Sequence, residues 1–126
     1  MMKDGIKFSK EQVEKDKRDF FCEVLKYHCK GEGKALIAGR LREMTGFNAR
    51  EIRNMVHQLR LEGEPICSGG SGYWYAEDSE EVANTLIWLK EMIIHLNRVH
   101  EALKETKYNM RHEEIKEGKR ASYFYK

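Results

Sequence analysis

Four hydrogen-bonding side chains recur in the middle of the chain at spacings that suit one face of a helix. They are Arg50, Arg53, Asn54 and His57, each of which has another member of the set three or four residues away. Arginine can donate two hydrogen bonds to guanine, and asparagine can pair in the same way with adenine. The major groove of DNA gives each base pair a distinct pattern of donors and acceptors. The spacing therefore predicts a helix face that reads bases. The alternative is an ordinary solvated helix surface, on which arginines are common.

The histidines, cysteines and glycines form none of the arrangements that are typical of catalysis or metal binding. The five histidines include no His-x-x-x-His pair, and the three cysteines include no Cys-x-x-Cys pair. The glycine-rich stretch 69–72 lacks the lysine and the Ser or Thr that follow in a phosphate-binding loop. We therefore expect no enzymatic activity, no cofactor, no metal ion and no small-molecule ligand.

Two helices are expected to precede the base-reading face and to support it. The first, over 9–30, starts with the capping-box spacing of Ser9 and Gln12. Its predicted apolar face is Val13, Phe20, Val24 and Tyr27, with Phe21 and His28 at the margin. The second helix is short, ends at Gly46, and has a predicted apolar stripe of Ile37, Leu41 and Met44.

The base-reading helix itself is expected over 49–62. Asn48 followed by Glu51 has the spacing of a capping box at its start. The side opposite the four polar residues is predicted to face the core, through Ile52, Met55, Val56 and Leu59. Two helices joined by a turn as tight as 45–47 predict a helix-turn-helix.

A β-hairpin is expected directly after this helix. Two short β-prone runs, 65–68 and 73–76, flank the glycines of 69–72, which can supply the backbone conformations of a tight turn. The order of helix, helix, tight turn, helix and hairpin predicts a mainly α fold with a small β-hairpin, a winged helix-turn-helix.

The stretch from about Phe20 to Ala76 also resembles a known family. The resemblance is carried by Leu59, Arg60, Gly63, Pro65, Ile66, Gly72 and Tyr73. These residues look like those of the winged-helix domains of bacterial and phage regulators, including the DNA-binding domain of biotin ligase repressors, and of small phage and prophage proteins. The resemblance implies that 49–62 is a recognition helix.

The predicted DNA-contacting surface combines this helix with neighbouring polar groups. The wing tip departs from many winged helices because 68–73 carries no charge, so it offers only backbone amides and two hydroxyls to phosphates. The net charge of +2 also leaves the attraction to DNA to a local patch. The expected contacts are Lys34, Asn48, Arg50, Arg53, Asn54, His57, Ser68 and Ser71.

A long C-terminal helix is expected from Ser79 to about Glu114. Its apolar residues alternate steps of four and three, a heptad seam that predicts a coiled-coil homodimer. The seam comprises Val82, Leu86, Leu89, Ile93, Leu96, His100 and Leu103. The alternative is a helix that simply completes the winged-helix core. The arrangement also resembles that of the bacterial replication terminator protein.

The chain divides into a winged-helix domain over 1–78, the dimerisation helix over 79–115 and a basic, aromatic tail over 116–126. The tail is expected to dock on the partner subunit, with disorder and nucleic-acid contact as alternatives. An odd number of cysteines predicts a reducing compartment. Without an apolar leader or a run of roughly 18 apolar residues, we expect a cytoplasmic protein that does not enter a membrane.

These features predict sequence-specific binding of double-stranded DNA by a winged-helix dimer. The expected role is that of a transcriptional regulator or a replication-associated protein of a phage or prophage. The alternative is a protein-interaction module that docks on a host or phage protein, for example as an inhibitor, without binding DNA.

Overall fold

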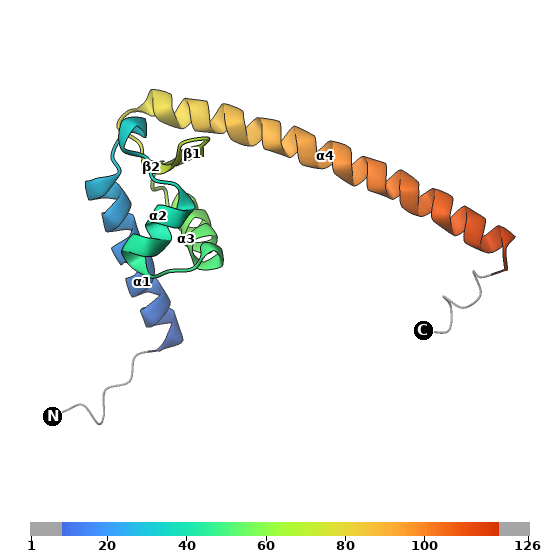
Figure 1. Ribbon diagram of the computed structural model, residues 1–126, viewed down its shortest axis with the longest axis horizontal. Coiled ribbons are helices and arrows are strands. Elements are labelled where there is room, and N and C mark those ends of the chain that lie inside the picture. The colour runs from blue at the N-terminus through green and yellow to red at the C-terminus, as the bar shows by residue number, and fades with distance from the viewer. Residues whose placement is uncertain (1–8, 119–126) are drawn as a thin grey trace. The chain divides into compact units, whose positions relative to one another are not determined.

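The computed structural model describes residues 9–118 and is mainly helical, with one antiparallel hairpin (Figure 1). It forms two compact units, one up to Leu86 and one from Ile87 onward. The elements are α1 (Lys10–His28), the 3-10 helix η2 (Glu32–Lys34), α2 (Ala38–Thr45), α3 (Ala49–Leu61), β1 (Ile66–Gly69), β2 (Gly72–Tyr75) and α4 (Ser79–Lys116). This order confirms the predicted succession of helices, hairpin and long C-terminal helix. Most of the predicted tail, 119–126, lies outside the described residues.

The apolar face of α1 differs from the predicted one. Phe21 and Leu25 are fully buried, whereas Phe20 and Tyr27 are exposed. The predicted apolar face was therefore wrong, because the buried face is rotated about the helix axis by one residue. The predicted and observed stripes share Val24, which is buried. At about 100° of rotation per residue, a stripe shifted by one position has the same periodicity, and periodicity alone does not choose between them.

The short helix α2 contributes a single buried side chain, Leu41, to the core. Ile37 and Met44 are exposed, so the predicted three-residue stripe was wrong at both ends. Gly46 ends the helix in the left-handed conformation, with φ 79°, and its N–H donates to the carbonyl of Arg42. The chain then enters α3 within three residues.

The helix α3 has the predicted cap and the predicted core face. The Asn48 side chain accepts from the Glu51 N–H at 2.8 Å, and the Glu51 carboxylate accepts from the Asn48 N–H at 2.9 Å. The four predicted core residues, Ile52, Met55, Val56 and Leu59, are all buried. Burying each such side chain contributes about 1.5–3 kcal/mol, so this face fixes the rotation of α3 about its axis.

The hairpin closes the core beside α3. Ile66 pairs with Tyr75 and Gly69 pairs with Gly72, and Trp74 is buried. On the other edge of β2, Leu36 exchanges two backbone hydrogen bonds with Tyr73, at 3.0 and 2.9 Å. This pairing was not predicted, and it explains Gly72, whose φ is 109° and whose added Cβ would lie 2.3 Å from the Leu36 carbonyl oxygen.

The start of α4 belongs to the first unit. Asp78 accepts from the N–H of Glu81 at 3.1 Å and so caps the N-terminal end of α4. Val82 packs against the core and Thr85 is buried. From Ile87 onward the helix continues to Lys116. No helix among residues 9–118 is long and apolar enough to span a membrane.

Candidate nucleic-acid interface

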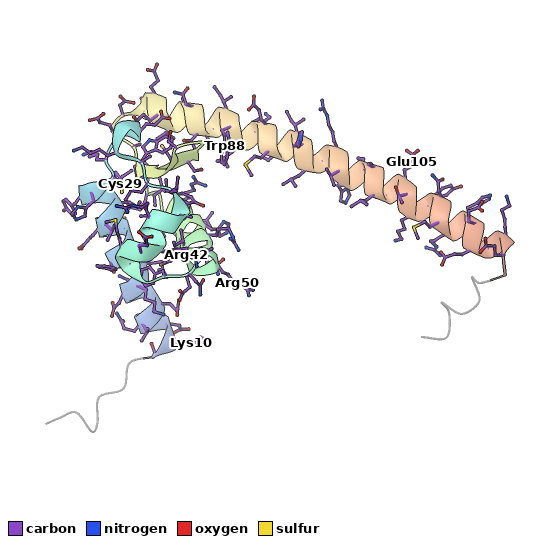
Figure 2. All side chains as sticks on the ribbon, viewed as in Figure 1. Lys10, Cys29, Arg42, Arg50, Trp88 and Glu105 are labelled. Carbon is purple, nitrogen blue, oxygen red and sulfur yellow. The ribbon has the colours of Figure 1, made fainter. Side chains whose placement is uncertain are left out.

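The outward face of α3 presents all four predicted base-reading side chains. Arg50, Arg53, Asn54 and His57 are exposed, and Figure 2 labels Arg50 and, on α2, Arg42. Neither Arg50 nor Arg53 forms an ion pair with any residue of 9–118. Their guanidinium groups are therefore free to meet an anionic ligand without first breaking an internal contact.

Two ion pairs hold α3 against α1. Arg18 lies 2.9 Å from Glu62, and Lys17 lies 3.6 Å from Glu51. Between the two helices is a hollow of about 230 Å³, whose lining includes Asn54 and Gln58 of α3. Sequence reasoning missed this hollow because it depends on the packing of α1 on α3.

A second hollow, of about 470 Å³, lies where α2 turns into α3. Its lining includes Arg42, Gly46 and Asn48, and the Arg42 side chain is exposed. Asn48 uses its side-chain oxygen to cap α3, which leaves its amide nitrogen as a donor. Arg42 was not among the predicted contacts. Its exposed position on α2, four residues before the helix-ending Gly46, was the signal that could have found it.

Ser68, a predicted phosphate contact, is not available. It is 7% exposed, and its hydroxyl accepts a hydrogen bond of 2.8 Å from Arg60. The Arg60 Nε also donates to the Ile66 carbonyl at 2.8 Å, and burial lowers the pKa of Arg60. Arg60 thus fastens α3 to β1 rather than contributing a free surface charge. The expectation for Ser68 is corrected for this reason.

The remaining predicted contacts, Lys34 and Ser71, are exposed. Ser71 at the hairpin tip lies 3.4 Å from the carboxylate of Glu32. A nearby carboxylate repels phosphate, so this end of the hairpin is a weak partner for a nucleic-acid backbone. On α2 and α3, the exposed arginines that take part in no ion pair within 9–118 are Arg42, Arg50 and Arg53.

One cluster that the sequence reasoning missed joins the start of α4 to the rest of the unit. The Glu81 carboxylate accepts from the Trp74 ring N–H at 3.1 Å and from the backbone N–H groups of Glu77 at 2.9 Å and Glu32 at 3.0 Å. The backbone hydrogen bonds from Glu77 and Glu32 are the main causes that lower the pKa of Glu81. This carboxylate fixes where α4 begins.

The predicted dimerisation residues include two that are half-buried and five that are exposed. Val82 is half-buried against the core, so it is not free to pair with a second chain, and the prediction is corrected there. Leu89 is half-buried. The other predicted dimerisation residues are exposed: Leu86, Ile93, Leu96, His100 and Leu103. The His100 ring nitrogen lies 3.2 Å from the Glu101 carboxylate.

The cysteines are free thiols with raised pKa values. Burial and the nearby Glu64 carboxylate raise the pKa of Cys22 to about 11, and burial raises the pKa of Cys29 and Cys67. A raised pKa keeps these thiols protonated at neutral pH and so makes them poor nucleophiles. Within 9–118 no group of three or more His, Cys, Asp or Glu side chains is placed to hold a metal ion.

Comparison with known proteins returned no relatives. No protein-family model matches the chain, and neither a curated protein nor a solved structure matches it.

Proposed function

We propose that the first unit is a winged helix-turn-helix that binds double-stranded DNA, with α3 in the major groove. The single observation that carries the proposal is the division of α3 into two faces. Ile52, Met55, Val56 and Leu59 are buried, whereas Arg50, Arg53, Asn54 and His57 are exposed. Arginine and asparagine match the edges of guanine and adenine.

In this proposal α2 and its turn meet the DNA backbone. Arg42 and the amide of Asn48 line the hollow at the start of α3 and supply donors for phosphate oxygens. Lys34 adds a further exposed positive charge. Because these cations displace condensed counterions, affinity should fall as the salt concentration rises.

A second chain completes the binding unit, paired through the exposed seam of α4. The hairpin tip carries no charge and Arg60 is occupied by the hairpin, so a single unit offers few phosphate contacts. Pairing two units lets two α3 helices read half-sites about one helical turn apart. The proposed role is that of a transcriptional regulator or a replication-associated protein, in line with the resemblance of residues 20–76 to winged-helix domains of bacterial and phage regulators.

Selection of binding sites from random duplex DNA tests this proposal. The purified protein, at low salt, should enrich a pseudo-palindromic site over several rounds. A Lys15→Glu variant is a control because Lys15 is an exposed lysine of α1, outside the proposed interface, that already pairs with Asp19 at 2.8 Å. The control should enrich the same site, and failure of the wild type to enrich any site would count against DNA binding.

A second candidate function is docking on another protein. The specific observation in its favour is the exposed apolar edge of α1, Val13, Phe20 and Tyr27, together with the uncharged hairpin tip. A protein partner that Arg50→Glu/Arg53→Glu protein retains but Phe20→Ser/Tyr27→Ser protein loses would support this function over DNA binding.

A further inference from the structure

The segment 86–96 of α4 carries apolar side chains on opposite sides of the helix. At about 100° of rotation per residue, Ile87 and Ile94 lie on the side opposite Leu89 and Leu96. Ile87 is 59% exposed and Ile94 is 44% exposed. A helix that is apolar on several sides is typically surrounded by protein. Pairing through the seam of Leu89 and Leu96 would leave the two isoleucines in water.

Four charged side chains border these isoleucines, and their order allows each to face an opposite charge on a second, antiparallel copy of the helix. Lys90 and Glu101 lie on one flank of the side that carries Ile94, and Glu91 and Arg98 lie on the other flank. In an antiparallel helix pair, each flank meets the same flank of the second helix. When the pair is centred near residue 95, Lys90 faces Glu101 of the second copy and Glu91 faces Arg98. Ile94 then lies near the centre of the contact, beside Ile94 of the second copy.

The charges are available for such pairing. Among residues 9–118, Lys90, Glu91 and Arg98 take part in no ion pair, and Glu101 contacts only the exposed side chains of His100 and Lys104. Side chains project from α4 all along its length (Figure 2). Exposed intrahelical pairs of this kind contribute little and exchange readily for contacts in an assembly.

We propose that this second face of α4, formed by Ile87, Lys90, Glu91, Ile94, Arg98 and Glu101, packs antiparallel on the same face of another copy. The contact joins two of the proposed dimers into a tetramer, so it rests on the proposed function. A tetramer carries two pairs of α3 helices and holds two DNA duplexes, or two sites on one duplex. Once one pair is bound, the effective concentration of the other favours the second site.

Charge exchange tests the tetramer in the full-length protein. Sedimentation equilibrium should give the wild type a mass four times that of the 14.9 kDa chain. Lys90→Glu places two acidic groups together and should raise the dissociation constant of the tetramer on the order of tenfold at low salt. The double variant Lys90→Glu/Glu101→Lys should restore the wild-type constant. Glu113→Lys, a charge reversal at an exposed carboxylate that lies beyond the proposed contact and off its face, is the matched control and should change little.

The outcomes separate this inference from the proposed function. A wild type that stays at twice the chain mass, or a Lys90→Glu variant that Glu101→Lys does not rescue, would overturn the tetramer and leave the dimer standing. A wild type at the mass of one chain would overturn both. In a capture assay, wild type bound to an immobilised duplex should retain a second labelled duplex. Ile94→Glu protein should bind the first duplex and not retain the second.

Discussion

The first unit of the chain buries many of its large apolar side chains, whereas the second unit leaves most of its own exposed. In the first unit Leu41 and Ile52 are 0% exposed, whereas in the second Leu96 and Leu103 are 64% and 62% exposed. A helix gains most of its stability in proteins from packing an apolar face rather than from its own propensity. The first unit therefore contains the contacts that stabilise it, and the second gains such contacts from other chains in the assembly proposed above.

Truncation of one apolar residue in each unit should give the largest contrast. We expect Ile52→Ala to lower the free energy of unfolding of the first unit by about 2–5 kcal/mol, because it leaves a cavity in the core. Leu96→Ala should change that free energy little. Urea unfolding followed by Trp74 fluorescence in a Trp88→Phe background measures both. An equal loss from the two substitutions would show that the units do not differ in this way.

A smaller loss is expected from Gly72→Ala in the hairpin. The new Cβ would lie 2.3 Å from the Leu36 carbonyl oxygen at a residue whose φ is 109°. We expect a loss of about 2–3 kcal/mol in the free energy of unfolding. Gly70→Ala is the control, because a Cβ there has nothing within 4 Å. Similar stabilities of the two variants would mean that the Leu36–Tyr73 pairing does not constrain the hairpin.

The smallest of these effects concerns Glu81, which joins the start of α4 to the rest of the first unit. Glu81→Gln should cost about 1–2 kcal/mol, because the charged acceptor of three hydrogen bonds is lost on a partly exposed side chain. The pKa of Glu81 is lowered below its ordinary value of 4.5 in the folded state. Its contribution is therefore present above pH of about 4.5 and is lost as pH falls through the lower, folded-state pKa.

Thermal unfolding across a pH series checks this effect. The stability difference between wild type and Glu81→Gln should shrink as pH falls below about 4.5. Glu80→Gln, at the exposed neighbouring carboxylate, should match the wild type at every pH. A difference between wild type and Glu81→Gln that grows toward acid pH would contradict the assigned role.

Local signals predicted the elements of this fold, and tertiary contacts account for what they missed. Gly46, the Asn48–Glu51 cap and the periodicity of Ile52 to Leu59 each act within a few residues, and they placed α3 correctly. The phase of α1 depends on which of two overlapping stripes packs into the core, where Phe21 and Leu25 are fully buried. The burial of Ser68 depends on Arg60, eight residues away. Neither fact can be read from periodicity or spacing.

The candidate site follows the same rule. Exposure of the α3 side chains came directly from the opposite periodicity of its core face. Arg42 was missed because its place beside the start of α3 depends on the geometry of the turn between two helices. The Glu81 cluster joins Glu32, Trp74 and Glu77 from three separate segments, and no local pattern predicts it.

The central claim is that the outward face of α3 binds DNA as part of a dimer. Its most direct test is the dissociation constant for a selected duplex, measured over a salt series for wild type and Arg50→Glu/Arg53→Glu. We expect the wild-type affinity to fall steeply with salt and the double variant to bind at least about 100-fold more weakly at low salt, with a shallower dependence. Equal affinity and equal salt dependence of the two proteins would contradict the claim.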